Sequence, residues 1–300
     1  MSDASNSSAG PPQVDEGNLY GYIPTEWICV LFVVLFALST AVHLGQAIYF
    51  RLWFLLPTIC LGGLAEVIGW SGRLWSSQNQ DSLNPFLMQI VTTIIAPTPY
   101  IAANFVILGE LIRRLGVKYS RLGAMWYSIL FISADIVSLV VQSIGGAKAA
   151  SAAEDNTSAT LGGNIMLGGI AFQLVCITIY MFLATEFITR YIWDLPVRDP
   201  SESKLQIRVL SRKVKMLLIG LAFSSTVIFI RSIYRTIELS DGWDGRIIHT
   251  QVFFNVLDGG MVTLAFYCTN IFHPGWLLGR GPWRQQNTAE VSEKMSDNSI

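Results

Sequence analysis

The sequence predicts an all-α integral membrane protein with seven transmembrane helices. Of its 300 residues, 52% are hydrophobic and only 14% are charged, and the mean hydropathy is +0.46. An ordinary soluble domain carries roughly 25% charged residues. The apolar residues gather in stretches of about 20 or more, the length that a helix needs to cross a bilayer. Membrane strands are not expected, because they need about 9–11 residues of alternating polarity.

Seven apolar stretches mark the expected helices in chain order. Arg51 alone separates the first two, which predicts a tight hairpin, with one bent re-entrant element as the alternative. Pro97 and Pro99 predict a break in the third helix, because proline lacks a backbone donor and clashes with the preceding turn. The expected helices are Trp27–Phe50, Leu52–Trp70, Phe86–Ile112, Leu122–Ile144, Gly162–Phe187, Met216–Ile237 and Ile247–Phe272.

Polar segments flank the apolar region at both ends of the chain. We expect a disordered extracellular tail over residues 1–26, a seven-helix transmembrane domain over residues 27–272 and a cytoplasmic tail over residues 273–300. The first tail lacks both a basic region and an apolar core, so we expect no cleavable signal peptide. The first transmembrane helix is then expected to direct insertion.

The orientation is predicted by the lysines and arginines between the helices. The loops after the first, third and fifth helices, with the C-terminal tail, hold fifteen of them, and the opposite connections hold three. Since cytoplasmic loops are enriched in basic residues, the N-terminus is predicted to be extracellular and the C-terminus cytoplasmic. Glycosylation sequons at Asn6 and Asn156 both fall on the predicted outer side.

Several function classes are disfavoured by what the sequence lacks. The formal charge of −1 indicates no nucleic-acid partner. The chain has no P-loop motif for ATP, and its last helix has no lysine for a retinal Schiff base. His43, His249 and His273 are expected near the inner, outer and inner membrane edges, so they predict no shared zinc site. We therefore expect no enzyme, no cofactor, no catalytic residues and no metal.

Ionisable residues within apolar helices are the main functional signal. Each costs about 2.5–3.5 kcal/mol at the centre of a membrane helix, so it needs a partner or a wet cavity. The candidates are Glu66, Asp135, Arg231, Asp258 and, near the cytoplasmic edge, Glu110. The first four are expected to share one layer of the bundle.

Two interpretations of that layer stay open. It can be a buried ion pair that fixes helix register, such as Arg231 with Asp258 or Glu66. Alternatively, three acids against one arginine leave a negative cavity for a cationic head group or a proton relay. Nearby, Arg231, Arg235 and Glu238 are spaced for local pairing near the outer interface. Hydrogen bonds between helices are expected for Gln142, Gln173 and Asn255.

Short motifs along the chain carry a family resemblance. They are Tyr22-Ile23-Pro24, Glu66 with Gly69 and Arg73, Ala96-Pro97 with Ala102-Ala103, Asp135 with Gln142 and Gly145-Gly146, Gly169 with Gln173, the run from Ile230 to Glu238, Asp258, and His273-Pro274-Gly275. Together they resemble the fungal lipid-translocating exporter family, which includes aminocholesterol-resistance proteins and exporters of sphingoid long-chain bases.

The resemblance implies a plasma-membrane protein that translocates or exports sphingoid long-chain bases or related toxic amphiphiles in a stress- or drug-resistance role. A vacuolar or other internal membrane is the alternative location. The expected partners are the membrane and a lipid or amphiphilic substrate, with no protein partner predicted. The substrate-binding or translocation candidates are Glu66, Asp135, Gln142, Gln173, Arg231, Arg235 and Asp258.

Three other functions stay open at this point, one of which is a structural or lipid-scaffold role. The chain could be a seven-helix sensor or regulator that acts through its basic cytoplasmic loop, between the fifth and sixth helices. It could also transport a porphyrin or haem, as the resemblance implies for other relatives.

Overall fold

The computed structural model describes residues 20–79, 82–155, 157–197, 210–242 and 245–279. These residues form helices and no strand, and seven helical spans are long and apolar enough to cross a membrane. The predicted number of spans is confirmed, and each expected stretch overlaps one of them. The spans are Glu26–Phe50, Trp53–Gln78, Leu83–Leu115, Ala124–Ala152, Thr160–Ile192, Arg212–Ser240 and Gln251–Leu278.

A tight hairpin joins the first two spans, as predicted. Helix α1 (Glu26–Phe50) ends at Arg51, whose φ of 58° places it in the left-handed region. The Leu52 amide then donates to the Ala47 carbonyl at 3.0 Å, which satisfies one of the free carbonyls at the helix end. The chain returns through η1 (Trp53–Leu55), the π-helical turn η2 (Leu56–Cys60) and α2 (Leu61–Gln78).

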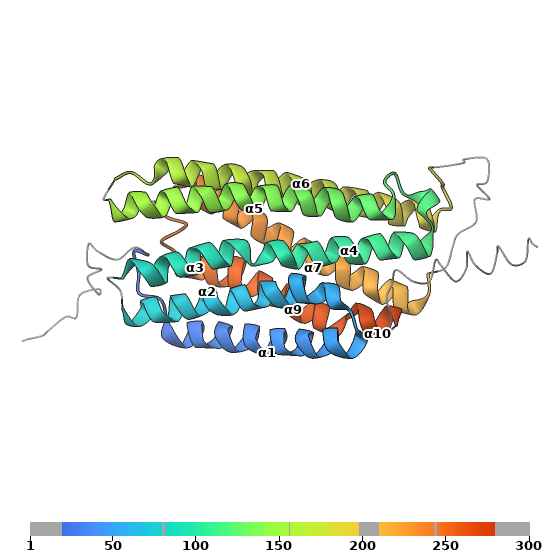
Figure 1. Ribbon diagram of the computed structural model, residues 1–300, viewed down its shortest axis with the longest axis horizontal. Coiled ribbons are helices and arrows are strands. Elements are labelled where there is room, and N and C mark those ends of the chain that lie inside the picture. Colours follow the sequence, from blue (N-terminus) through green and yellow to red (C-terminus); the bar gives the residue numbers. More distant parts are fainter. Residues whose placement is uncertain (1–19, 80–81, 156, 198–209, 243–244, 280–300) are drawn as a thin grey trace, which may run out of the picture.

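The third span is the central helix of the bundle. It consists of α3 (Leu83–Ile95) and α4 (Pro97–Leu115), with the expected break at Ala96 immediately before the first proline. Of its most apolar window, 72% is buried, against 28% for the first and fourth spans. Figure 1 shows α3 and α4 between the α1–α2 layer and the α5–α6 layer. Polar side chains of this span therefore face other helices.

Helices α5 (Ala124–Glu154) and α6 (Thr160–Ile192) form a second, longer hairpin. Both run beyond the C-terminal ends of their expected apolar stretches, α5 as far as Glu154 and α6 as far as Ile192. A Cβ at Gly162 would collide with the backbone of Ala149, so the missing side chain lets the two helices approach closely. The Ser138 hydroxyl also donates across this interface to the Gly169 carbonyl, at 2.7 Å.

The last two spans complete the bundle. Helix α7 (Arg212–Ser240) crosses it obliquely, and the final span follows (Figure 1). That span is composed of α8 (Gln251–Phe253), the π-helical turn η5 (Phe254–Gly260), α9 (Met261–Ile271) and α10 (Pro274–Leu278). We call the end of the bundle where α1, α4 and α6 finish and α7 begins the basic end, because it carries Arg51, Arg113, Arg114, Arg190 and Arg212.

We predict opposite effects for two glycine substitutions in α6. Gly162→Ala should lower the melting temperature of the purified protein, because overpacking typically costs about 1–3 kcal/mol. Gly168→Ala is the matched control, since no atom lies within 4 Å of the position that its Cβ would take. It should leave the melting temperature unchanged or raise it, because alanine favours helix over glycine by roughly 0.5–1 kcal/mol. Equal shifts in both variants would contradict the tight α5–α6 contact.

Candidate functional site

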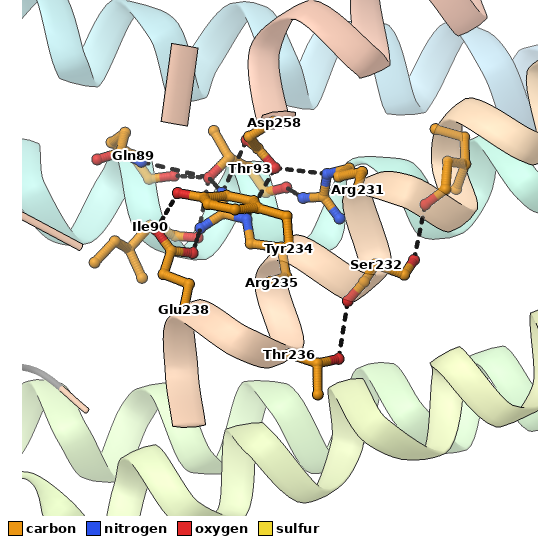
Figure 2. Close-up of polar contacts among 11 residues, drawn as sticks. Gln89, Ile90, Thr93, Arg231, Ser232, Tyr234, Arg235, Thr236, Glu238 and Asp258 are labelled. Carbon is orange, nitrogen blue, oxygen red and sulfur yellow. Dashed lines mark hydrogen bonds and ion pairs between the residues drawn. The ribbon is translucent and has the colours of Figure 1, made fainter. Parts of the chain in front are cut away.

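A buried carboxylate, Asp258, lies at the centre of a group of charged side chains (Figure 2). It projects from η5 and is fully buried. The Arg231 Nε lies 2.7 Å from Asp258 Oδ1. Arg235 binds the same carboxylate through two atoms, with Nε 2.8 Å from Oδ1 and Nη2 2.9 Å from Oδ2. One acid thus holds two arginines of α7, and the predicted pairing of Arg231 with Asp258 is confirmed.

The contacts extend from Asp258 to further residues of α7 and α3. Arg235 Nη1 donates to Glu238 Oε2 at 2.8 Å, and the Tyr234 hydroxyl donates to Glu238 Oε1 at 2.7 Å. Arg235 also donates to the Thr93 hydroxyl at 3.1 Å, while Arg231 donates to the Thr93 carbonyl at 2.5 Å. We call Asp258, Arg231, Arg235 and Glu238 the ion cluster. It ties α7 to η5 and to the central helix.

Local sequence explains why these side chains meet. Arg231, Arg235 and Glu238 follow one another at spacings of four and three residues, so they lie on one face of α7. Asp258 lies in a π-helical turn, a wide turn that recurs at functional sites. A Cβ on the next residue, Gly259, would collide with the ring of Trp70, so glycine allows η5 to lie close to α2.

Glu66 of α2 lies beside the ion cluster without joining its bonds. Its side chain is fully buried, close to the charges of Asp258, Arg231 and Arg235 and to the Trp70 indole. Neither of its carboxyl oxygens has a hydrogen-bond partner among the residues that the structure describes. Glu66 is therefore the acid in this region with the most unoccupied hydrogen-bond acceptors.

Arg73 is a site residue that lies beyond Trp70, the expected end of the second helix. It lies inside α2 with 1% of its surface exposed, and its guanidinium is surrounded by the rings of Tyr20, Tyr22, Trp70 and Phe254. Its Nη2 donates to the Tyr22 hydroxyl at 2.5 Å. The centroid of the Phe254 ring lies 4.4 Å from the guanidinium carbon of Arg73 and 4.9 Å from that of Arg235. The seven-residue spacing from Glu66, which places both on one face of α2, was the available signal.

These placements correct the expected charge of the site. The expectation of three acids against one arginine is wrong, because Arg235 binds Asp258 directly and Arg73 is buried beside Phe254, which also contacts Arg235. The buried set around Asp258 contains the acids Glu66, Glu238 and Asp258 and the arginines Arg73, Arg231 and Arg235. With all six ionised, its formal charges balance, so the described residues provide no strongly negative cavity here.

Asp135 stands apart from this group, although all four candidates were expected in one layer. It lies on α5, is 3% exposed, and faces Cys176 of α6. No ion pair joins it to another described residue, and its Oδ2 has no hydrogen-bond partner there. The helical rotation of α5 directs its buried face toward α4 and α6, which is why Asp135 does not reach Asp258.

Other sequence candidates form contacts between helices. The Gln142 amide donates to Gln173 Oε1 at 3.2 Å, and the Gln173 amide donates to the Thr98 hydroxyl at 3.1 Å. This chain of bonds links α5, α6 and α4, as expected for the two glutamines. Asn255 differs, since its Oδ1 has no partner in the described part of the chain. Glu110 pairs locally with Arg113 and Arg114, at 3.3 and 2.8 Å, near the basic end.

The two predicted glycosylation residues, Asn6 and Asn156, lie outside the described residues. Within the described ranges, no three histidine, cysteine, aspartate or glutamate side chains are grouped in a way that could hold a metal ion. The four cysteines are free thiols.

Comparison with known proteins places the chain in a family. The model of the family described as RTA1 like protein matches residues 59–281, which include every member of the ion cluster. The chain belongs to the RTA1-like family. This membership confirms the resemblance to lipid-translocating exporters that the short motifs indicated.

Several yeast relatives of this RTA1-like chain are known. The sphingoid long-chain base transporter RSB1 of Saccharomyces cerevisiae is 33% identical over 92% of this chain and 80% of its own length. Protein RTA1 of the same species is 27% identical over 86% of this chain and 87% of its own length. Protein RTM1 is 30% identical over 68% of this chain and 62% of its own. None of these names describes an enzyme, and no solved structure matches.

We predict that the ion cluster is required for stability. Asp258→Asn leaves Arg231 and Arg235 buried without their carboxylate, and removal of one partner from a buried ion pair typically costs about 3–5 kcal/mol. Thermal unfolding in detergent should therefore show a marked loss of stability. Glu186→Gln is the control, because Glu186 pairs with the largely exposed Arg121 and should change stability little. Equal stability of the Asp258 variant and the wild type would contradict this role.

Proposed function

We propose that this chain translocates or exports sphingoid long-chain bases or related cationic amphiphiles across the plasma membrane, in a stress- or drug-resistance role. The observation that carries the proposal is a buried cluster of acids and arginines in a chain that aligns along most of its length with a sphingoid-base transporter. Charged groups buried within membrane helices commonly mark substrate or ion pathways. We further propose that the basic end faces the cytoplasm.

Head-group binding is proposed to begin at Glu66. A sphingoid base carries an ammonium group, which can donate to a carboxylate with unused acceptors. Asp258 forms an ion pair with Arg231 and accepts hydrogen bonds from Arg235, whereas both oxygens of Glu66 lack a hydrogen-bond partner among the described residues. An ammonium at Glu66 would add a positive charge beside two arginines, so the ion pairs of Asp258 would have to rearrange. Arg231 and Arg235 would thereby take part in substrate release.

The described arrangement is closed to a head group. The cavity that reaches Arg235 and Glu238 has a volume of about 20 Å³, room for about one water molecule. Tyr20 and Tyr22 line it, and the Tyr20 hydroxyl donates to the Ser76 hydroxyl at 3.3 Å. Burial raises the pKa of Tyr20 to about 12, so this phenol stays a neutral donor. The segment at residues 20–22 would have to move for a lipid head to leave on this side.

Asp135, Gln142 and Gln173 are proposed as a second polar position on the path. They lie between α4, α5 and α6, away from the ion cluster. Asp135 is a buried acid without an ion pair in the described part of the chain, so it can accept an ammonium or a proton. An acid that takes up a proton could couple transport to protons, which would suit a carrier whose sequence has no P-loop for ATP.

The proposed activity predicts transport by the purified protein alone. Liposomes that contain the chain should move a labelled sphingoid base between leaflets faster than protein-free liposomes. Cells that carry the protein should likewise release a preloaded base faster than cells without it, with ATP-depleted cells measured in parallel. Absence of movement in both systems, with protein present at the cell surface, would refute the proposal. Release by cells without movement in liposomes would instead favour the alternative function, a seven-helix sensor or regulator.

The head-group assignment predicts a specific loss in two variants. Glu66→Gln and Asp135→Asn should each lower the initial rate of efflux about tenfold, because a hydrogen bond to a charged group is worth about 1.5–3 kcal/mol. Glu26→Gln is the matched control, since Glu26 is an exposed acid in the first turn of α1. Surface expression should be equal in all variants. Full export by both Glu66→Gln and Asp135→Asn would overturn the assignment.

A further inference from the structure

A lateral groove separates α6 from α7 near the basic end. Its volume is about 470 Å³, and Leu108 of α4 forms part of its floor. Apolar side chains supply most of its walls. Ala184 of α6 and Ala222 of α7 face each other's helices here, and their small side chains leave the space unfilled.

The groove follows from the oblique course of α7. At the opposite end, α6 and α7 come together, and Gly163 and Leu239 line one shared hollow. Toward its start, α7 lies instead against the last span, where Cys268 Sγ donates to the Gly220 carbonyl at 3.5 Å. Figure 1 shows this divergence of α7 from the α5–α6 layer. Ile219 on the groove wall is 52% exposed, so the groove opens sideways, toward the hydrocarbon of a bilayer.

The described charges near the groove mouth are positive. Lys215 lines the groove, and Arg212 and Lys213 belong to the same first turn of α7. Among the residues that the structure describes, none that lines the groove is acidic. The nearest acid along α6, Glu186, binds Arg121 and Arg190 at 2.7 and 2.8 Å. An apolar groove with a cationic mouth suits an alkyl chain that carries an anionic head group, and it disfavours the ammonium of a sphingoid base.

We propose that this groove binds one acyl chain of an anionic phospholipid from the leaflet at the basic end. Lys215 would contact the phosphate, because a lysine near a membrane end extends its ammonium to the head-group level. The lateral opening lets the second acyl chain stay in the bilayer, which favours a two-chain phospholipid over a single-chain lipid phosphate. This binding site is independent of the molecule that the protein transports.

The test is lipid retention, measured by native mass spectrometry of the full chain. Purified protein in mild detergent receives equal amounts of phosphatidylserine and phosphatidylcholine with identical acyl chains. The wild type should retain phosphatidylserine preferentially. Lys215→Glu should reduce that preference by about fivefold or more, the effect of one basic residue at a membrane surface. Ala222→Trp should fill the groove and reduce retention of both lipids.

Two variants control for charge and size. Lys148→Glu changes an exposed lysine at the opposite end, and Phe223→Trp enlarges an exposed neighbour of Ala222 that does not line the groove. Both should retain lipid as the wild type does. A wild type without preference, equal losses in the controls, or displacement of phosphatidylserine by an equal amount of a sphingoid base phosphate would overturn the proposal.

Discussion

The contact of Asp258 with Arg231 and Arg235 is the interaction on which the bundle interior depends. Two guanidinium groups in a membrane interior are stable only beside acceptors, and one fully buried carboxylate provides these for both. Thr93 of the central helix accepts further bonds from the same arginines. These contacts fix the register of three helical spans. Replacement of one charged residue alone would leave its partner buried without a counter-charge.

The remaining polar contacts connect helices around this centre. Asn104 of α4 donates to Ser224 of α7 at 3.1 Å, and Tyr100 of α4 donates to the Ala265 carbonyl of α9 at 2.8 Å. Hydrogen bonds of this kind add specificity to helix packing in lipid, where the hydrophobic effect does not drive helices together. The central helix supplies one partner in each of these hydrogen bonds. The polar contacts inside the bundle therefore depend on the burial of this helix.

The fold was predictable from the sequence because bilayer thickness fixes the length of an apolar helix. Arg51 and Pro97 also marked the hairpin and the break correctly, since each acts on the local backbone. The site was predictable only in part. Whether a side chain faces Asp258 depends on how each helix is rotated, which hydropathy does not report. Hence Asp135 was grouped wrongly, and Arg73 was placed beyond the end of the second helix although aromatic rings enclose it.

The order of the charges along the chain has a consequence for biosynthesis. Arg231 and Arg235 belong to α7, but their shared carboxylate belongs to the span that follows. When α7 leaves the ribosome, it therefore reaches the insertion machinery before its main counter-charge exists. Charged residues at a helix centre oppose insertion, so α7 should settle stably in lipid only once the final span has emerged. The two last spans would then enter the membrane as one unit.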